Sequence, residues 1–207
     1  MLNFIIKGGP IMYPIIIGSI FGLMIVFERF FTFRGMKLDT FNFVQNIFRE
    51  LKENNIKKAL ELCGNTSHPI AAVFKIGIER RDLPLDRLEK ILEQAGNNQI
   101  QKLEKGLGAL VSISSIEPLL GFLGTITGLI RAFMSWEQAG PNVTVSALAA
   151  GIYEAMITTA AGLIIAIPLY LCYNYFMSRI KVTANELTNH AIQLLEVIAE
   201  MNKDGRR

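Results

Sequence analysis

The sequence predicts an all-α membrane protein with three transmembrane helices and long cytoplasmic helical extensions. Of its 207 residues, 51% are hydrophobic and only 19% are charged, and the mean hydropathy is +0.34. Soluble domains carry about 25% charged residues. The charged residues gather in residues 29–105 and 179–207, which leaves three long stretches nearly free of charge. Crossing the hydrocarbon core takes about 20 apolar residues, and each stretch supplies enough of them.

The first predicted transmembrane helix covers residues 11–31 and follows an N-terminal segment of residues 1–10. Residues 11–27 are almost uninterrupted apolar side chains. Glu28 and Arg29 follow, and their long side chains can reach the membrane interface. A cleaved signal peptide has a shorter apolar core and a small-residue cleavage site, so we expect a retained helix.

The second and third predicted transmembrane helices cover residues 106–134 and 145–178, and a loop of residues 135–144 joins them. Glu154 is the only charged residue of the third helix. Both stretches are longer than a single bilayer crossing requires, so we expect both helices to continue into the cytoplasm.

Lys and Arg residues set the expected orientation, because they concentrate at the cytoplasmic ends of membrane helices. They lie near the predicted inner ends of all three helices, in residues 32–105 and 179–207, whereas the loop 135–144 has none. We therefore expect residues 32–105 to form a cytoplasmic helical domain and residues 179–207 a cytoplasmic helix and tail. Segment 1–10 and the loop lie outside, where Trp136 fits the membrane interface.

The cytoplasmic segments are predicted to be helical. Residues 39–51, 56–63 and 70–78 are short amphipathic stretches. A longer helix is expected to begin near Pro84 with Asp82 as its cap, and we find no signal that stops it before the second transmembrane helix. At the other end of the chain, a heptad stripe predicts packing against another helix. It consists of Ile180, Ala184, Leu187, Ala191, Leu194, Ile198 and Met201.

Small and polar residues follow one side of the second and third transmembrane helices. Small residues let helices approach closely in lipid, so these two helices are expected to pack tightly. For the threonines, a hydrogen bond to the carbonyl one turn earlier is an equally simple interpretation. The residues are Gly121, Gly124, Thr125 and Gly128 in one helix, and Ala147, Gly151, Glu154, Thr158 and Ala161 in the other.

Glu154 is costly in a membrane helix, by roughly 2.5–3.5 kcal/mol on insertion scales. We expect it about two turns inside the outer boundary, either as a hydrogen-bonded structural acid or as a stop on a proton or cation path. Glu117 is expected about one turn inside the cytoplasmic boundary, where its side chain can reach headgroup water.

Two segments carry a family resemblance. Residues 117–130 (EPLLGFLGTITGLI) and 151–168 (GIYEAMITTAAGLIIAIP) resemble the signature of the ExbB/TolQ/MotA proton-channel family. The order of helices agrees along nearly the whole chain, and the fourth span of MotA-type proteins is missing, so the resemblance is closest to ExbB. The matching residues are Pro118, Gly121, Gly124 and Thr125 in the second helix, and Glu154, Thr159, Gly162 and Pro168 in the third.

The resemblance implies a homopentamer in a bacterial inner membrane. The pentamer would surround a pair of single-span partners of the ExbD or TolR type, and proton flow would drive work on a TonB-like or TolA-like protein. Thr125 and Thr159 would line the pore beside an acid of the partner. Glu117 departs from the family pattern, which usually has Ala at this position. Five copies would place a ring of acids near the cytoplasmic mouth of the pore, so the sequence leaves open whether the coupling ion is a proton or sodium. Glu154 and Thr159 are about 140° apart on a helix, so both cannot face one axis.

Other functions find less support in the sequence. No motif of an intramembrane hydrolase is present, so we do not expect an enzyme, a metal or a cofactor. Cys63 and Cys172 have no ligand-like spacing and are expected to be unpaired. Scattered basic residues without aromatic neighbours argue against nucleic acid. A TolQ-like subunit, a stand-alone cation channel and a structural scaffold remain as alternatives.

Overall fold

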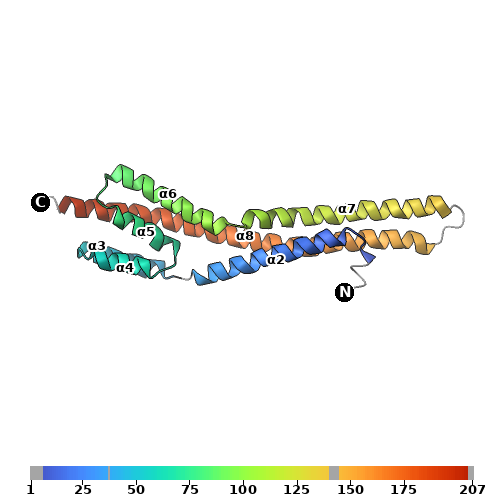
Figure 1. Cartoon of the computed structure of the whole chain (residues 1–207), viewed down its shortest axis with the longest axis horizontal. Helices are drawn as coiled ribbons and strands as arrows, with labels where there is room; N and C mark the ends of the chain where they lie inside the picture. Colours follow the sequence, from blue (N-terminus) through green and yellow to red (C-terminus); the bar gives the residue numbers. More distant parts are fainter. Residues whose placement is uncertain (1–6, 37, 140–144, 205–207) are drawn as a thin grey trace. The chain divides into compact units, whose positions relative to one another are not determined.

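A computed structural model of the chain describes residues 7–36, 38–139 and 145–204, and every regular element within them is an α-helix (Figure 1). The all-α prediction is therefore confirmed for this part of the chain. The helices are α2 (Met12–Gly35), α3 (Thr40–Lys52), α4 (Ile56–Gly64), α5 (Pro69–Glu79), α6 (Leu85–Glu104), α7 (Leu107–Ala139) and α8 (Val145–Asp204).

Among the described residues, three helical stretches are long and apolar enough to cross a membrane, as the sequence predicts. They are Met12–Gly35, Leu85–Gln138 and Ala149–Lys203. Many large apolar side chains on α2, α7 and α8 are exposed, with Leu119 at 65% and Ile164 at 71%. Apolar surface of this extent requires lipid or other protein chains to cover it.

The chain divides into two compact units. The first contains the described residues up to Arg29 together with Gly106–Tyr175, and the second contains Phe30–Lys105 together with Phe176–Arg207 as far as the structure describes it. Helix α8 contributes to both units as one helix of 60 residues.

The second unit has its own hydrophobic core, formed by α3 to α6 and the last part of α8. Phe74, Leu88 and Leu194 are fully buried in it. Leu194 contacts α5 where Gly77 has no side chain, which confirms that the predicted heptad stripe packs against other helices. This packing follows from the amphipathic sequences of the short helices.

Polar groups fix the ends of the short helices in the second unit. The Asp39 carboxylate accepts a hydrogen bond from the Asn42 N–H at 3.2 Å and caps α3. His68 Nδ1 accepts one from the Ile70 N–H at 3.3 Å and caps α5. Such caps satisfy N–H groups that have no partner inside the helix.

Two expectations for the helix from Pro84 are wrong. Pro84 itself is the N-cap of α6 and no side chain caps the helix, so Asp82 does not have the predicted role. The helix also does not continue into the second apolar stretch. It ends at Glu104, and α7 begins at Leu107, because Gly106 between them has a φ of +80°. This left-handed conformation is open to glycine and interrupts the helical hydrogen bonds.

Candidate ion-pathway site on helices α7 and α8

A seam of small residues joins α7 and the first part of α8, which lie antiparallel to each other (Figure 1). A Cβ atom on Gly128 would lie 2.7 Å from the Gly151 carbonyl oxygen, and one on Gly121 would lie 3.0 Å from the Thr158 carbonyl oxygen. The two backbones come this close because glycine has no side chain. The predicted packing glycines all lie along this seam, namely Gly121, Gly124, Gly128, Gly151 and Gly162.

The two prolines of the predicted packing set lie inside helices. Pro118 is half-buried within α7, and Pro168 is exposed within α8. A packing role for Pro168 inside one chain is therefore not supported by its position.

Thr125 and Thr159 meet at one edge of the seam. Their hydroxyl groups form a short hydrogen bond with each other. Thr159 Oγ1 also lies 3.0 Å from the Gly121 carbonyl oxygen of α7, and Thr125 Oγ1 lies 3.3 Å from the Ala155 carbonyl oxygen of α8. Both threonines are half-buried, so this polar pair reaches the surface of the chain.

The Thr125–Thr159 pair is rich in acceptors and poor in donors. Each hydroxyl has one proton and two acceptor lone pairs. One proton joins the two hydroxyls, and the other can donate to a backbone carbonyl within reach. Lone pairs remain on both oxygens, whereas neither proton is left over. The pair is therefore suited to accept a hydrogen bond from a water or a protonated acid.

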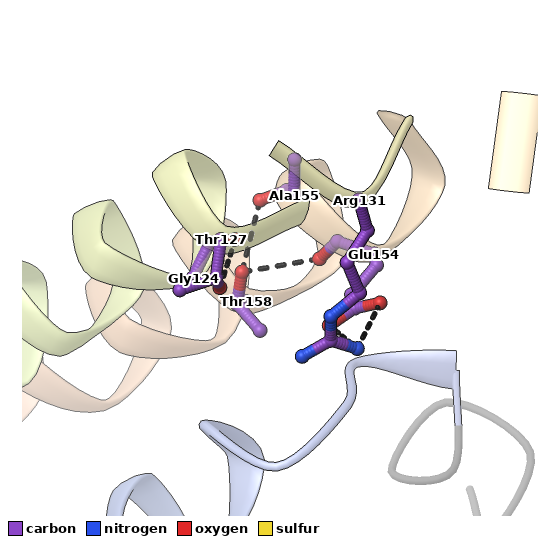
Figure 2. A network of polar contacts seen from close by, with 6 residues as sticks. All are labelled: Gly124, Thr127, Arg131, Glu154, Ala155 and Thr158. Carbon is purple, nitrogen blue, oxygen red and sulfur yellow. Dashed lines mark hydrogen bonds and ion pairs between the residues drawn. The ribbon is translucent and has the colours of Figure 1, made fainter. Parts of the chain in front are cut away.

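Thr158 lies in the centre of the seam and not at its edge. Its side chain is fully buried and faces α7 where Gly124 leaves room for it (Figure 2). Its hydroxyl donates to the carbonyl of Ala155, at 3.0 Å, or of Glu154, at 3.1 Å. The predicted pore-lining role does not fit this placement, because Thr158 fills space inside one chain.

Glu154 forms an ion pair with Arg131 of α7 (Figure 2). Arg131 Nη1 is 2.8 Å from Oε1 and 3.0 Å from Oε2 of the carboxylate. The Glu154 side chain is 13% exposed, and that of Arg131 is 47% exposed. The carboxylate also lies against Gly9, whose φ of +68° and missing side chain let the segment before α2 pass close to it.

Glu117 is buried against α2. Its residue is 2% exposed, and its Oε1 occupies the space where Gly18 lacks a side chain. Among the described residues, no group forms a hydrogen bond with Oε2. An expectation that this side chain reaches headgroup water, or lines a pore within reach of solvent, does not fit this burial.

The depths of the two acids along α2 are the reverse of what we expected from the sequence. Glu154 lies beside Gly9, which precedes the first residue of α2. Glu117 lies beside Gly18, about ten residues or roughly 15 Å before Glu28. Measured along α2, Glu117 is therefore in the middle of the apolar stretch and Glu154 at its end.

The seam separates the threonine pair from the Arg131–Glu154 ion pair. The threonine pair lies at one edge, and the Arg131–Glu154 pair lies at the other, beside the N-terminal segment. This agrees with the angle of about 140° between Glu154 and Thr159 on a helix. Arg131 was not predicted as the partner of Glu154. The signal was available, because the two residues lie at similar distances from the loop that joins their helices.

The structure describes no cluster of His, Cys, Asp or Glu side chains that could hold a metal ion, within the residues that it places. Cys63 is buried and Cys172 is half-buried, and both are free thiols. Burial raises the pKa of the Cys63 thiol to about 12, which keeps it protonated and unreactive.

Comparisons with known proteins agree with the resemblance. ExbB-like protein 1 of Synechocystis is 30% identical over 86% of this chain and 71% of that protein. ExbB of Neisseria gonorrhoeae is 35% identical over 51% of this chain and 48% of that protein. The Tol-Pal system protein TolQ of Haemophilus influenzae is 34% identical over 48% of this chain and 43% of that protein. A family model also matches residues 65–189, so this chain belongs to the MotA/TolQ/ExbB proton channel family.

Proposed function

We propose that this chain is the channel-forming subunit of a proton-driven complex in a bacterial inner membrane. It acts with an ExbD-like single-span partner and transfers the energy of the proton gradient to a TonB-like protein for nutrient transport across the outer membrane. Its N-terminus and the loop 135–144 face the periplasm, and residues 32–105 and 179–207 lie in the cytoplasm. Family membership and the three apolar helical stretches support this proposal.

The observation that carries the proposal is the position of the Thr125–Thr159 pair. It is the polar group at the edge of the seam that faces away from the Arg131–Glu154 pair, and its oxygens have lone pairs to spare. A protonated acid on a partner helix can donate to this pair. An ionised acid needs donors, which the pair cannot supply, and in apolar surroundings its charge is costly.

Protonation of the partner's acid then changes which position the partner prefers. The neutral acid is held at the threonine pair, and the ionised acid is driven to more hydrated surroundings. The proton gradient supplies protons on one side of the membrane and removes them on the other. The preferred position of the partner helix therefore changes repeatedly, and this motion performs work. No covalent bond forms or breaks, so the chain acts as a channel subunit and not as an enzyme.

We propose a homopentamer as the assembly that suits this mechanism best. One chain offers a single threonine pair on one edge of two helices, and large apolar side chains beside it are exposed, among them Phe122 and Ile126. Further copies of the chain and membrane lipids would cover this apolar surface. Five copies around a pair of partner helices would bring the threonine pairs to a common axis.

A TolQ-like role in envelope maintenance is the second candidate. TolQ of Haemophilus influenzae is 34% identical over 48% of this chain, which is close to the 35% over 51% found for ExbB of Neisseria gonorrhoeae. The two roles differ in the partner proteins. Co-purification of a TonB-like protein with this chain would favour the ExbB-like role, and co-purification of a TolA-like protein would favour the TolQ-like role.

Replacing Thr125 and Thr159 together by Val tests the proposal. Val keeps the shape and removes the hydroxyl groups, so the complex should assemble normally while energised uptake is lost. Thr127→Val is the matched control, because its hydroxyl donates only to the Gly124 carbonyl of its own helix, at 3.1 Å. Cells that depend on the variant for uptake, and a pull-down of the partner, give the two readouts. Normal uptake by the double variant would sink the proposal.

A further inference from the structure

Glu117 is a buried acid for which the proposed mechanism has no use. It sits in α7 opposite Gly18 of α2, is 2% exposed, and leaves Oε2 without a hydrogen bond to any described residue. The Ser114 hydroxyl one turn away is already engaged, since it donates to the Val111 carbonyl at 2.8 Å. The atoms nearest to the space beside Gly18 are those of Glu117 and the methyl group of Ile113.

No charged group faces Glu117 from the helices packed against it. Residues 8–27 of the α2 side and 155–178 of α8 contain no charged residue, and Glu117 is the only charge in residues 106–130. The remaining titratable side chains of these stretches are Tyr13, Tyr170, Cys172, Tyr173 and Tyr175. The charged pairs at the ends, Arg29 with Glu28 and Arg131 with Glu154, lie about two or more helical turns away along their helices.

An ionised carboxylate at this position is almost fully shielded from solvent and has no counter-ion on the neighbouring stretches of α2 and α8. The free energy of such a charge is far higher than that of the neutral acid, so the acid holds a proton instead. Sodium does not fit this position, because a metal cation needs several oxygen ligands. Among the described residues, no group forms a hydrogen bond with Oε2, and the nearby Ser114 hydroxyl is already engaged.

We propose that Glu117 is a proton-binding site in each subunit, buried at the contact of α2 with α7 and separate from the threonine pair. Gly18 makes the site possible, since a side chain at this position would overlap Oε1. In the resting state of this contact the carboxyl group is neutral and holds its proton, and it exchanges this proton with water only when water reaches Oε2. The inference rests on the membrane placement in the proposed function, but not on the role of Thr125 and Thr159.

Infrared spectroscopy of the full-length protein in lipid vesicles tests this site directly. A protonated carboxyl group has a C=O stretching band that a carboxylate lacks. At pH 7 we expect this band in the wild type, its loss in Glu117→Gln, and its retention in Glu154→Gln, because Glu154 is paired with the Arg131 guanidinium group. A wild-type spectrum that Glu117→Gln leaves unchanged would overturn the inference.

Two further measurements identify what Glu117 binds. The band should disappear reversibly when the pH is raised and return when it is lowered, and a band that persists until the protein unfolds would make Glu117 a permanent structural acid. Replacing choline chloride by sodium chloride should leave the band unchanged, whereas its loss would make the site a sodium site. The double variant with Thr125→Val and Thr159→Val should keep the band. The infrared test of Glu117 therefore gives its result independently of whether the proposed mechanism at the threonine pair is correct.

Discussion

The two acids of the first unit differ in their partners. Glu154 has a guanidinium group within 3.0 Å of both carboxylate oxygens, and Glu117 has no such partner. Glu154 is therefore best described as one half of a fixed ion pair that joins the C-terminal part of α7 to the N-terminal part of α8. This favours the structural interpretation of Glu154 over a stop on the ion path.

Breaking the pair from one side should destabilise the protein. Arg131→Gln leaves the mostly buried Glu154 carboxylate without its counter-ion, at a cost of about 1–3 kcal/mol, between the values for exposed and buried pairs. Exchanging the charges, with Arg131→Glu and Glu154→Arg together, should restore much of this loss. Thermal unfolding in detergent measures both, with Arg34→Gln as an exposed control. Equal stability of Arg131→Gln and the wild type would contradict the assignment.

His68 should make the second unit less stable in weak acid. Burial lowers the pKa of His68 from 6.5, and the charge of Glu186 opposes this only in part. The unfolded chain therefore binds the proton first, so stability is complete above the unfolded pKa and is lost as the pH falls towards the folded one. Protonation also removes the Nδ1 acceptor that caps α5.

The measurement for His68 is the melting temperature of the purified protein between pH 7 and about pH 5, compared with His68→Asn. Asn keeps a capping acceptor but does not titrate, so its curve should be flatter. The Glu50 carboxylate does not contribute to the change in melting temperature over this pH range. Its hydrogen bond with Lys58 lowers its pKa below 4.5, so its contribution is lost only at more acidic pH. Parallel curves for both proteins would rule out His68 as the cause.

Whole elements depend on the backbone at Gly106. Its φ of +80° ends α6 and lets α7 start anew, and a Cβ there would meet only the Ile25 methyl group, at an ordinary 3.6 Å. Gly106→Ala should therefore cost about 1–2 kcal/mol for conformational reasons alone. Gly108→Ala is the matched control, because Gly108 lies in the first turn of α7 with open space around it, and the change should stabilise by no more than about 0.5 kcal/mol. Thermal unfolding that ranks the two variants the other way would contradict the left-handed conformation.

Much of the helical structure could be predicted, since α3, α4 and α5 follow the amphipathic patterns of residues 39–51, 56–63 and 70–78. The break at Gly106 could not, because a glycine next to an apolar stretch resembles the first small residue of a helix. The depths of Glu117 and Glu154 depend on how far α2 is shifted along α7 and α8. Only contacts such as those of Gly9 and Gly18 reveal this shift.

At the scale of the whole molecule, the site is incomplete in one chain. The threonine pair faces outward from its two helices, and apolar side chains surround it on the exposed surface. A channel with a partner acid opposite this pair accounts for both features. In the proposed function the titrating acid belongs to the partner, so the chain by itself should conduct few protons.

Proton flux into lipid vesicles tests this account most directly. Vesicles with the chain and its single-span partner should acidify when a pH gradient and a membrane potential are applied, and vesicles with the chain alone should not. Thr125→Val with Thr159→Val should abolish the flux while the purified complex keeps its composition, and Thr127→Val should not. Undiminished flux through the double variant, or equal flux through the chain alone, would contradict the account.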